Sequence, residues 1–272
     1  METYYSEKIC LVSGAASGIG KAVCQALLAQ GACVIAADIN EPALREWSTE
    51  YDADSLHINA LDVTDYGAFD ELISAIVKEH KSLDFLFNIA GITIAGEATD
   101  LTIAHWRKVM SVDLDGVING SVLAYKQMAI QGTGHIVNLA SIQGLVPLPM
   151  EAPYVTAKFG VVGLSQALRV EGADLGVKVS VVCPGYVKTP IFAQSEMVNL
   201  DREKHLKSLE DHEKSGISPE GCAQVILSGV VRNKAIIPVT SAAKLLWWLG
   251  RVSPSLLLKA LRRDLALARD AR

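Results

Sequence analysis

The 272-residue chain has little of what several classes of protein need. Its five cysteines include no Cys-x-x-Cys pair and fall mostly in apolar runs, so they are interpreted as small buried residues. The net charge is −5, and seven of the 25 basic residues lie in the terminal segment 241–272. Nucleic-acid binding is therefore not expected, because it needs a broad basic surface.

Targeting and metal signals are also missing. The N-terminus is polar and runs quickly into a strand pattern, so no secretory signal is expected. We expect a reducing, cytoplasmic setting. No cluster of metal-ligating side chains stands out, and no metal site is predicted.

What is present is an alternation of short apolar runs with helical patterns. Half of the residues are hydrophobic, enough for one large core or a core plus a lid. The predicted strands are 8–13, 33–38, 55–59, 83–87, 134–140, 178–183 and 235–239. Their alternation with helices predicts an α/β fold: a doubly wound parallel sheet of Rossmann type within residues 1–240.

Residues suited to ligand binding follow the predicted strands. Ligands of such sheets bind beyond the carboxyl ends of the strands. Five residues stand at or just after these ends: Gly14, Asp38, Asn88, Ser141 and Pro184. The sequence therefore places a binding site at this edge.

A glycine-rich turn joins the first strand to the first helix. Gly14 permits a tight turn, and Gly18 and Gly20 let the backbone approach a pyrophosphate at the positive end of the helix. Asp38 ends the next strand, where an acid can bind the adenosine ribose. Because this acid repels a 2′-phosphate and no Arg or Lys lies within the turn, NAD is favoured over NADP. A turn that merely needs flexible residues is the alternative.

A second group of residues can move a proton on and off an alcohol oxygen. Tyr154 and Lys158 are four residues apart, which places them on one face of a helix, and Ser141 lies thirteen residues before Tyr154. A free tyrosine has a pKa of about 10, and an adjacent ammonium lowers it. We therefore expect Lys158 to make Tyr154 a better base. A chance Tyr–Lys pair is the alternative.

These motifs together resemble the short-chain dehydrogenase/reductase family. The similar segments run in family order over about residues 8–240. They are Ser13–Gly20, Asp62-Val63, Asn88–Gly91, Gly134–Ser141, Tyr154-x-x-x-Lys158 and Pro184–Thr189. The resemblance implies that Tyr154 is the general acid/base, that Ser141 holds the substrate oxygen and that Lys158 binds the nicotinamide ribose.

The resemblance also implies a set of NAD-binding residues and a homodimer or homotetramer. The expected cofactor-binding residues are Gly14, Ser17, Gly18, Ile19, Gly20, Asp38, Asp62, Val63, Asn88, Ala90, Gly91, Tyr154, Lys158, Pro184, Gly185, Val187 and Thr189.

One position departs from the family pattern. Asp113 stands where the family usually has a catalytic Asn. An Asp accepts the same hydrogen bonds but lacks the amide donor, and its charge stabilises a lysine cation and disfavours a phenolate. We therefore expect Asp113 to take part in the site and to alter the pH dependence of catalysis.

Residues from about 189 to 215 resemble the family's substrate lid, which would exclude water and set specificity. Expected pocket residues are Ile94, Gln143, Leu145, Met150, Tyr186 and Phe192, with Ile92, Ile191 and Met197 as further candidates. Most are apolar, so we expect a bulky, largely apolar secondary alcohol or ketone, such as a steroid-like, alicyclic or acyl-chain compound. Packing of the lid alone is the alternative.

Residues 241–272 differ from the rest in carrying a net charge of +5. Arg251 and Pro254 interrupt their apolar run, which is too short to span a bilayer. Two amphipathic helices split near Ser253-Pro254 are predicted. They would dock on the cleft or a neighbouring subunit, or lie on an anionic membrane.

The sequence as a whole predicts an NAD-dependent oxidoreductase that interconverts a secondary alcohol and a ketone. A non-catalytic NAD-binding partner subunit of a hetero-oligomer is the main alternative, because Asp113 departs from the family pattern. A membrane-recruited scaffold rests on the tail alone.

Overall fold

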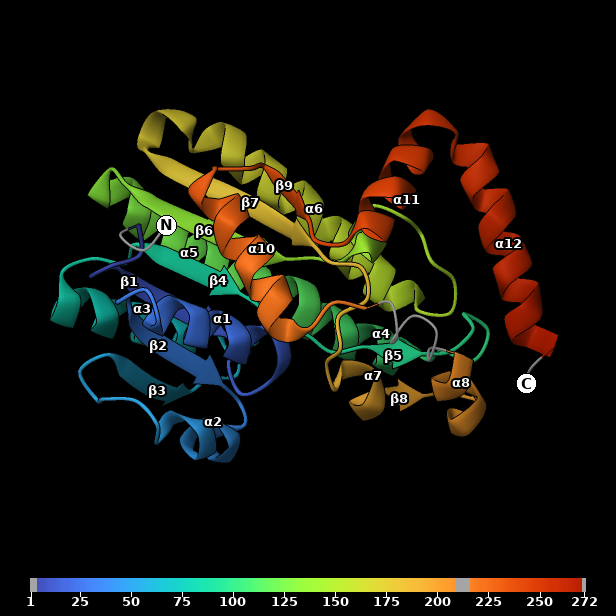
Figure 1. Ribbon diagram of the computed structural model, residues 1–272, viewed down its shortest axis with the longest axis horizontal. Coiled ribbons are helices and arrows are strands. Elements are labelled where there is room, and N and C mark those ends of the chain that lie inside the picture. Colours follow the sequence, from blue (N-terminus) through green and yellow to red (C-terminus); the bar gives the residue numbers. More distant parts are fainter. Residues whose placement is uncertain (1–3, 209–215, 271–272) are drawn as a thin grey trace.

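The computed structural model describes residues 4–208 and 216–270 and has a seven-stranded sheet at its centre (Figure 1). The strand order is β3-β2-β1-β4-β6-β7-β9, and every neighbouring pair is parallel. The strands are β1 Ile9–Ser13, β2 Cys33–Asp38, β3 Leu56–Ala60, β4 Phe85–Asn88, β6 Gly134–Leu139, β7 Val177–Cys183 and β9 Ile236–Pro238. All seven predicted strands are therefore confirmed.

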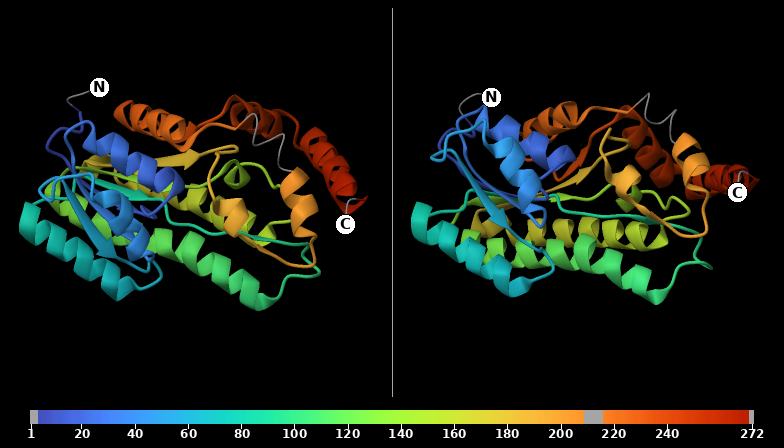
Figure 2. Two further views of the ribbon diagram at one scale, coloured as in Figure 1. Left: turned by 60° about the horizontal axis from the view of Figure 1, so that its bottom comes forward. Right: turned by 90° about the horizontal axis from the view of Figure 1, so that it is seen from below.

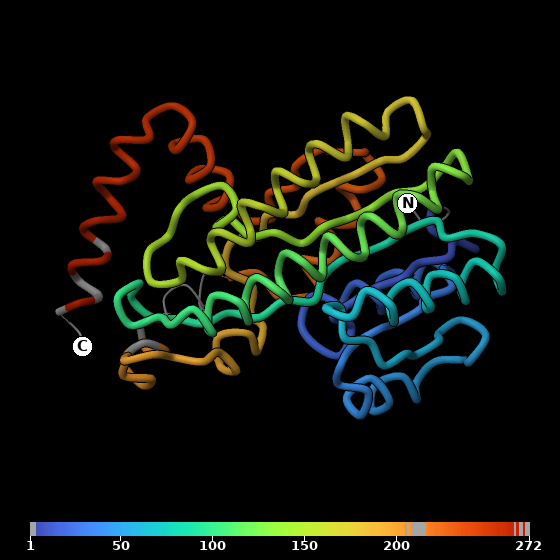
Figure 3. Tube along the Cα trace, turned by 180° about the vertical axis from the view of Figure 1, so that it is seen from behind, coloured from blue at the N-terminus to red at the C-terminus, as the bar shows by residue number. Residues whose placement is uncertain are grey.

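The helices cover the sheet in two layers (Figure 2). One face carries α1 (Gly18–Leu28), α2 (Glu41–Ser48) and α10 (Pro219–Val231). The other face carries α3 (Tyr66–His80), α5 (Gly116–Gln131) and α6 (Ala152–Glu171), and Figure 3 shows α5 and α6 running side by side. The predicted doubly wound α/β fold is confirmed.

Strand β1 shows why these apolar runs form central strands. Cys10 and Val12 pack into the core under α1, whereas Ile9 and Leu11 pack into the core on the opposite face. Successive side chains of a strand point to opposite faces, so a strand covered on both sides must be apolar throughout. Because β1, β4 and β6 are parallel neighbours, their carboxyl ends meet at one edge of the sheet, where the site lies.

The helix before α5 contains an irregular turn. Helix α4 (Ile103–Met110) continues through a π-helical turn, η1 (Ser111–Asp115), into α5. Such turns are rare and often occur at functional sites. The turn carries Asp113, whose side chain is fully buried.

The predicted lid contains α7 (Ile191–Gln194), β8 (Glu196–Met197) and α8 (Arg202–Ser208). Strand β8 pairs with β5 (Ile94–Ala95), which ties this segment to the chain that follows β4. Residues 209–215 of the predicted lid lie outside the described residues.

The C-terminal segment forms α11 (Ser241–Val252) and α12 (Pro254–Asp270), which meet at the predicted Ser253-Pro254 break. Ala243, Leu257 and Leu261 pack against Ile142 and Val146 of the loop after β6. Arg269 of α12 forms an ion pair with Glu97. Within residues 4–208 and 216–270, no helix combines the length and hydrophobicity needed to cross a bilayer.

Candidate active site

The glycine-rich turn folds tightly against the end of β4. Gly14 has a left-handed backbone, with φ of 69°, and a Cβ there would lie 2.6 Å from the backbone nitrogen of Ala90. A Cβ on Gly20 would lie 2.0 Å from the carbonyl oxygen of Gly14. Ser17 precedes α1 without capping it through its side chain. The first amides of α1 are thus available to an anion at the positive end of the helix.

A cleft of about 770 Å³ lies beside this turn, a volume that suits a cofactor. Most of the expected cofactor-binding residues line it. They are Gly14, Ser17, Gly18, Ile19, Gly20, Asp38, Asp62, Val63, Ala90, Gly91 and Thr189. The cleft is therefore the candidate dinucleotide site.

The carboxylate of Asp38 is held in place at one end of this cleft. One oxygen accepts a hydrogen bond from the backbone N–H of Ala16 at 3.0 Å, and the other accepts one from Asn40 at 2.9 Å. These bonds link the acid to the glycine-rich turn. A ribose hydroxyl can donate to the remaining lone pairs, whereas a phosphate would meet a negative charge.

Asn88 is placed differently from the prediction. Its side-chain amide donates to Asn138 Oδ1 at 2.9 Å and to Ser121 Oγ at 3.2 Å, and Asn88 is 2% exposed. The side chain does not line the dinucleotide cleft, because it points between β6 and α5. Asn88 therefore joins elements beneath the site instead of presenting its amide to a ligand.

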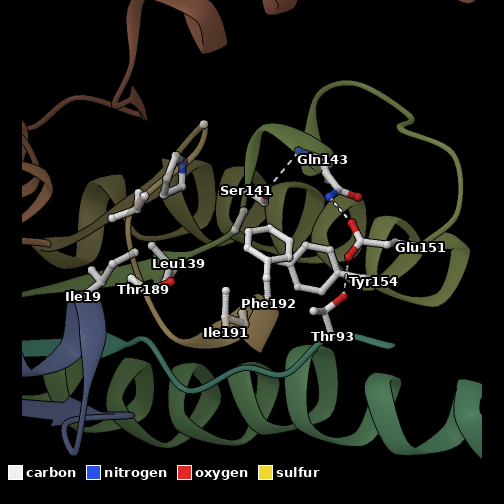
Figure 4. A pocket seen from close by; sticks show the side chains of 14 residues that line it. Ile19, Thr93, Leu139, Ser141, Gln143, Glu151, Tyr154, Thr189, Ile191 and Phe192 are labelled. Carbon is white, nitrogen blue, oxygen red and sulfur yellow. Dashed lines mark hydrogen bonds between the residues drawn. The ribbon is translucent and has the colours of Figure 1, made fainter. Parts of the chain in front are cut away.

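A smaller cavity of about 90 Å³ adjoins the cleft, and two of the three residues of the expected proton-transfer group line it (Figure 4). Ser141 and Tyr154 line it, as do the expected nicotinamide-binding residues Pro184, Gly185 and Val187. The cleft and the cavity share four lining residues. These are Ile19, Leu139, Thr189 and Ile191. A dinucleotide in the cleft can therefore reach a substrate in the cavity.

Ser141 and Tyr154 come from neighbouring elements. Ser141 follows β6, and its hydroxyl accepts a hydrogen bond at 3.1 Å from the backbone N–H of Gln143, in η2 (Ile142–Gly144). Tyr154 lies in the first turn of α6 and hydrogen-bonds to Ser141. The two hydroxyl groups are thus placed to share one substrate oxygen.

Lys158 lies one helical turn after Tyr154, with Nζ 5.2 Å from the centre of the Tyr154 ring. This nitrogen also lies 2.8 Å from Asp113 Oδ1 and donates to the carbonyl oxygen of Leu139 at 3.2 Å. The other Asp113 oxygen accepts a hydrogen bond from the backbone N–H of Ile92 at 3.1 Å. The predicted set of Ser141, Tyr154, Lys158 and Asp113 is brought together.

The electrostatics of Tyr154 differ from the prediction. Burial, the Asp113 carboxylate and the Glu151 carboxylate raise the pKa of Tyr154 well above its usual value, and the hydrogen bond from Ser141 only partly opposes this. Lys158 was expected to lower this pKa, but its ammonium is paired with Asp113. Burial likewise raises the pKa of the Asp113 carboxyl, against the effect of Lys158. At neutral pH the phenol therefore keeps its proton.

Glu151 is a site residue that the sequence reasoning missed. It lines the small cavity, and its carboxylate accepts hydrogen bonds from Thr93 Oγ1 at 2.8 Å and from Gln143 Nε2. Thr93, just before β5, was also missed. The available signal was that Glu151 is the lone charged residue of the apolar stretch 144–153.

The expected substrate-binding residues divide into two groups. Gln143 and Phe192 line the small cavity, and so does Ile191. Ile94, Leu145, Met150 and Tyr186 do not line it. Ile94 is buried by the β5–β8 pair, Leu145 packs against the core under α11 and α12, and Tyr186 stacks on the Phe192 ring. The carbonyl of Met150 accepts a hydrogen bond from Gly96.

Three possible metal ligands meet elsewhere, although no metal cluster was predicted. Ligand atoms of Cys33, His57 and His80 all lie within 4.8 Å of one another. These residues are far apart in sequence, so no spacing motif indicated them. Cys33 begins β2, at the edge of the sheet opposite the site, and the group takes no part in its chemistry.

Comparison with known proteins decides the family. Residues 8–198 match the short chain dehydrogenase family. The chain belongs to that family. The chain is 37% identical over 196 residues to a trans-4-hydroxycyclohexanecarboxylate dehydrogenase of Sinomonas cyclohexanicum, covering 69% of this chain and 75% of that one. It is 31% identical over 263 residues to the probable oxidoreductase EphD of Mycobacterium tuberculosis, covering 93% of this chain but only 44% of EphD.

Solved structures share the fold of this chain. A short-chain dehydrogenase/reductase from Burkholderia phymatum, solved in complex with NAD, superposes with a TM-score of 0.84 at 23% identity, covering 93% of this chain and 95% of that one. Levodione reductase superposes with a TM-score of 0.78 at 26% identity, covering 87% and 97%.

Proposed function

We propose that this dehydrogenase uses NAD to interconvert a secondary alcohol and a ketone on a compact, largely apolar substrate. The observation that carries the proposal is that Ser141 and Tyr154 line one cavity, which shares lining residues with the dinucleotide cleft. The likeness to a dehydrogenase of a hydroxycyclohexane compound supports CH–OH chemistry.

The roles of the protein groups follow from their positions. Bound NAD supplies the hydride acceptor or donor. Ser141 holds the substrate oxygen by a hydrogen bond. Tyr154 gives its proton to that oxygen in reduction and takes the proton back in oxidation. Because the pKa of Tyr154 is raised, the proton-donating form predominates at neutral pH, and oxidation of the alcohol needs the minor, deprotonated form.

Asp38 supports the choice of NAD. Its carboxylate lies at the dinucleotide cleft and is fixed there by two backbone amides. The one basic side chain among the described residues of the cleft lining is Lys108, and it forms an ion pair with Glu196. The structurally similar protein from Burkholderia phymatum was solved with NAD.

The substrate cavity favours small rings over larger molecules. Its volume is about 90 Å³, and apolar side chains dominate its wall. These include Ile19, Leu139, Val187, Ile191 and Phe192. Among the expected substrates, a compact alicyclic alcohol or ketone fits this space better than a steroid.

Turnover tests the proposal. Purified protein with NAD and cyclohexanol, or with NADH and cyclohexanone, should change absorbance at the NADH wavelength. Tyr154→Phe should lower kcat by at least about 100-fold, because a general acid/base is worth that much or more. NAD binding, measured by calorimetry, should persist. The matched control is Tyr125→Phe, which removes a hydroxyl on α5 that makes no hydrogen bond within the described residues.

The partner-subunit alternative gives a different result. It is favoured by one observation, the pairing of Lys158 with Asp113 in place of the family Asn. A partner subunit would bind NAD but turn over none of a panel of secondary alcohols and ketones, and Tyr154→Phe would change nothing. Turnover that depends on Tyr154 rejects this alternative.

We also propose that the outer side of α11 contacts an anionic membrane surface. Leu245, Trp248 and Val252 are 70%, 68% and 63% exposed, at spacings that place them on one side of the helix. Lys244 and Arg251 flank them and are exposed. A helix with exposed apolar, aromatic and basic side chains suits the interface of an anionic bilayer.

A further inference from the structure

A buried polar group interrupts the apolar wall of the substrate cavity. Thr93, Gln143 and Glu151 line the cavity and are 5%, 6% and 8% exposed. They come from three places in the fold: the segment before β5, the turn η2 and the residue preceding α6. Figure 4 shows the Glu151 carboxylate between the other two side chains. Burying a carboxylate is costly, so its presence beside Tyr154 calls for a functional reason.

The hydrogen bonds of Glu151 favour its charged form. One oxygen accepts from the Thr93 hydroxyl and the other accepts from the Gln143 amide. Burial, with the Asp113 carboxylate nearby, raises the pKa of Glu151, and these two donors oppose that rise in part because they favour the charged form. A carboxylate can accept about four hydrogen bonds, so acceptor capacity is left over.

Gln143 holds the Glu151 carboxylate in place. Its amide nitrogen donates to Glu151, while its Oε1 is itself buried and has no hydrogen-bond partner among the described residues. The acceptor that lines the cavity is therefore the Glu151 carboxylate, and a ligand can use its remaining capacity only with a donor.

We propose that Glu151, held by Thr93 and Gln143, forms a subsite for a second hydrogen-bond donor of the substrate, a hydroxyl or an ammonium group. The proposal rests on the proposed function, because the subsite belongs to the cavity that holds the reacting alcohol. The substrate class is then a compact diol, hydroxyketone or amino alcohol. A substrate carboxylate is excluded, because it would meet the buried negative charge of Glu151. This specificity differs from that of the hydroxycyclohexanecarboxylate-oxidising relative.

Four ring alcohols that differ in one substituent test the subsite. They are cyclohexanol, trans-cyclohexane-1,4-diol, trans-4-aminocyclohexanol and trans-4-hydroxycyclohexanecarboxylate. We expect kcat/KM with NAD to be at least about 10-fold higher for the diol or the amino alcohol than for cyclohexanol, because a buried acceptor left without a donor is costly. The carboxylate should fall at least about 10-fold below cyclohexanol. A preference for the amino alcohol over the diol identifies the donor as an ammonium group, and the reverse identifies a hydroxyl.

Two substitutions connect the preference to Glu151. Glu151→Gln keeps the size and removes the charge, so the penalty against the carboxylate should shrink and an amino-alcohol preference should vanish. Glu151→Leu should also remove the diol preference, because kcat/KM should fall further for the diol than for cyclohexanol. The control is Glu171→Gln, the same change on an exposed acid at the other end of α6, and it should leave all ratios unchanged.

The outcomes separate this proposal from the proposed function. The subsite is overturned if the protein oxidises cyclohexanol, the diol and the amino alcohol with equal kcat/KM. It is also overturned if the carboxylate is the preferred substrate. In both cases the proposed redox function is retained. If no alcohol is turned over, calorimetry on the NADH-saturated protein still ranks the four compounds by binding. A ranking there that is the same for wild type and Glu151→Gln rejects the subsite.

Discussion

Lys158 Nζ lies 2.8 Å from Asp113 Oδ1, and the two side chains are 2% and 0% exposed. The pair joins α6 to the π-helical turn η1 and places an ammonium and a carboxylate beneath Tyr154. In a family where this acid is usually an Asn, the lysine would have no carboxylate partner. Burial and then the Asp113 carboxylate raise the pKa of Tyr154, although a lysine lies one turn away, because that lysine is paired with Asp113.

Asp113→Asn should move the pH profile of alcohol oxidation to lower pH. The Asp113 carboxylate raises the pKa of Tyr154, so its removal lowers that pKa, and the phenolate that accepts the alcohol proton forms at lower pH. We expect the rising limb of kcat/KM against pH to shift by about one unit or more, as nearby charges typically cause. Asp115→Asn, an exposed neighbour in the same turn, is the control. Superimposable profiles for wild type and Asp113→Asn would contradict the assignment.

Asp38→Asn should relax the preference for NAD. The substitution removes the negative charge that a 2′-phosphate would meet, while an amide can still bind the ribose. Repulsion between like charges costs several kcal/mol, so the ratio of kcat/KM for NADP to that for NAD should rise by at least about 10-fold. Asp52→Asn, on an exposed loop, serves as the control. An unchanged ratio would show that another residue sets the cofactor choice.

The sheet and the dinucleotide cleft were predictable because their signals are local. An apolar run such as Ile9–Ser13 is what a strand covered on both faces requires, and the glycines that follow it must allow close backbone approach. The set of Ser141, Tyr154 and Lys158 was predictable for the same reason. The end of β6 determines the position of Ser141, and one turn of α6 determines the positions of Tyr154 and Lys158.

The wall of the substrate cavity was not predictable from such signals. Glu151 meets Thr93 across 58 residues of sequence, and only the folded chain brings them together. Ile94 was misplaced because a two-residue strand has no periodicity to read, and its pairing with β8 turns it away from the cavity. The raised pKa of Tyr154 also depends on the ion pair between Lys158 and Asp113, which the spacing of these residues in the sequence does not specify.

His135 should make the protein less stable in mild acid. His135 is buried in β6, where it donates from Nε2 to Ser180 Oγ at 2.8 Å, since that hydroxyl itself donates to the Lys234 carbonyl. Burial, with Lys178 and Arg169 nearby, lowers the pKa of His135 to about 3 from 6.5.

The sign of this effect follows from linkage. Above pH 6.5 the imidazole is neutral in the folded and the unfolded chain, so it does not change the free energy of unfolding. Below pH 6.5 the unfolded chain binds a proton at this imidazole, whereas the folded chain does not. The free energy of unfolding should therefore fall by about 1 kcal/mol between pH 7 and 5.5, in addition to other groups. Urea unfolding of wild type and His135→Gln at both pH values measures this difference, and an equal fall in both proteins would contradict it.

Trp248→Ser should weaken binding to anionic vesicles without disturbing the fold. Trp248 is exposed on α11, whereas Trp247 packs on the core formed with the loop after β6. Wild type should cosediment with vesicles containing phosphatidylserine and not with neutral ones, and added salt should release it because the attraction of Lys244 and Arg251 is screened. Lys126→Glu, an exposed charge reversal on α5, is the control for net charge. A different result would assign the outer side of α11 to a subunit interface. In that case light scattering would show that Trp248→Ser dissociates an oligomer, and no variant would bind vesicles. An exposed apolar stripe of this kind marks an interaction site, on a membrane or on another subunit.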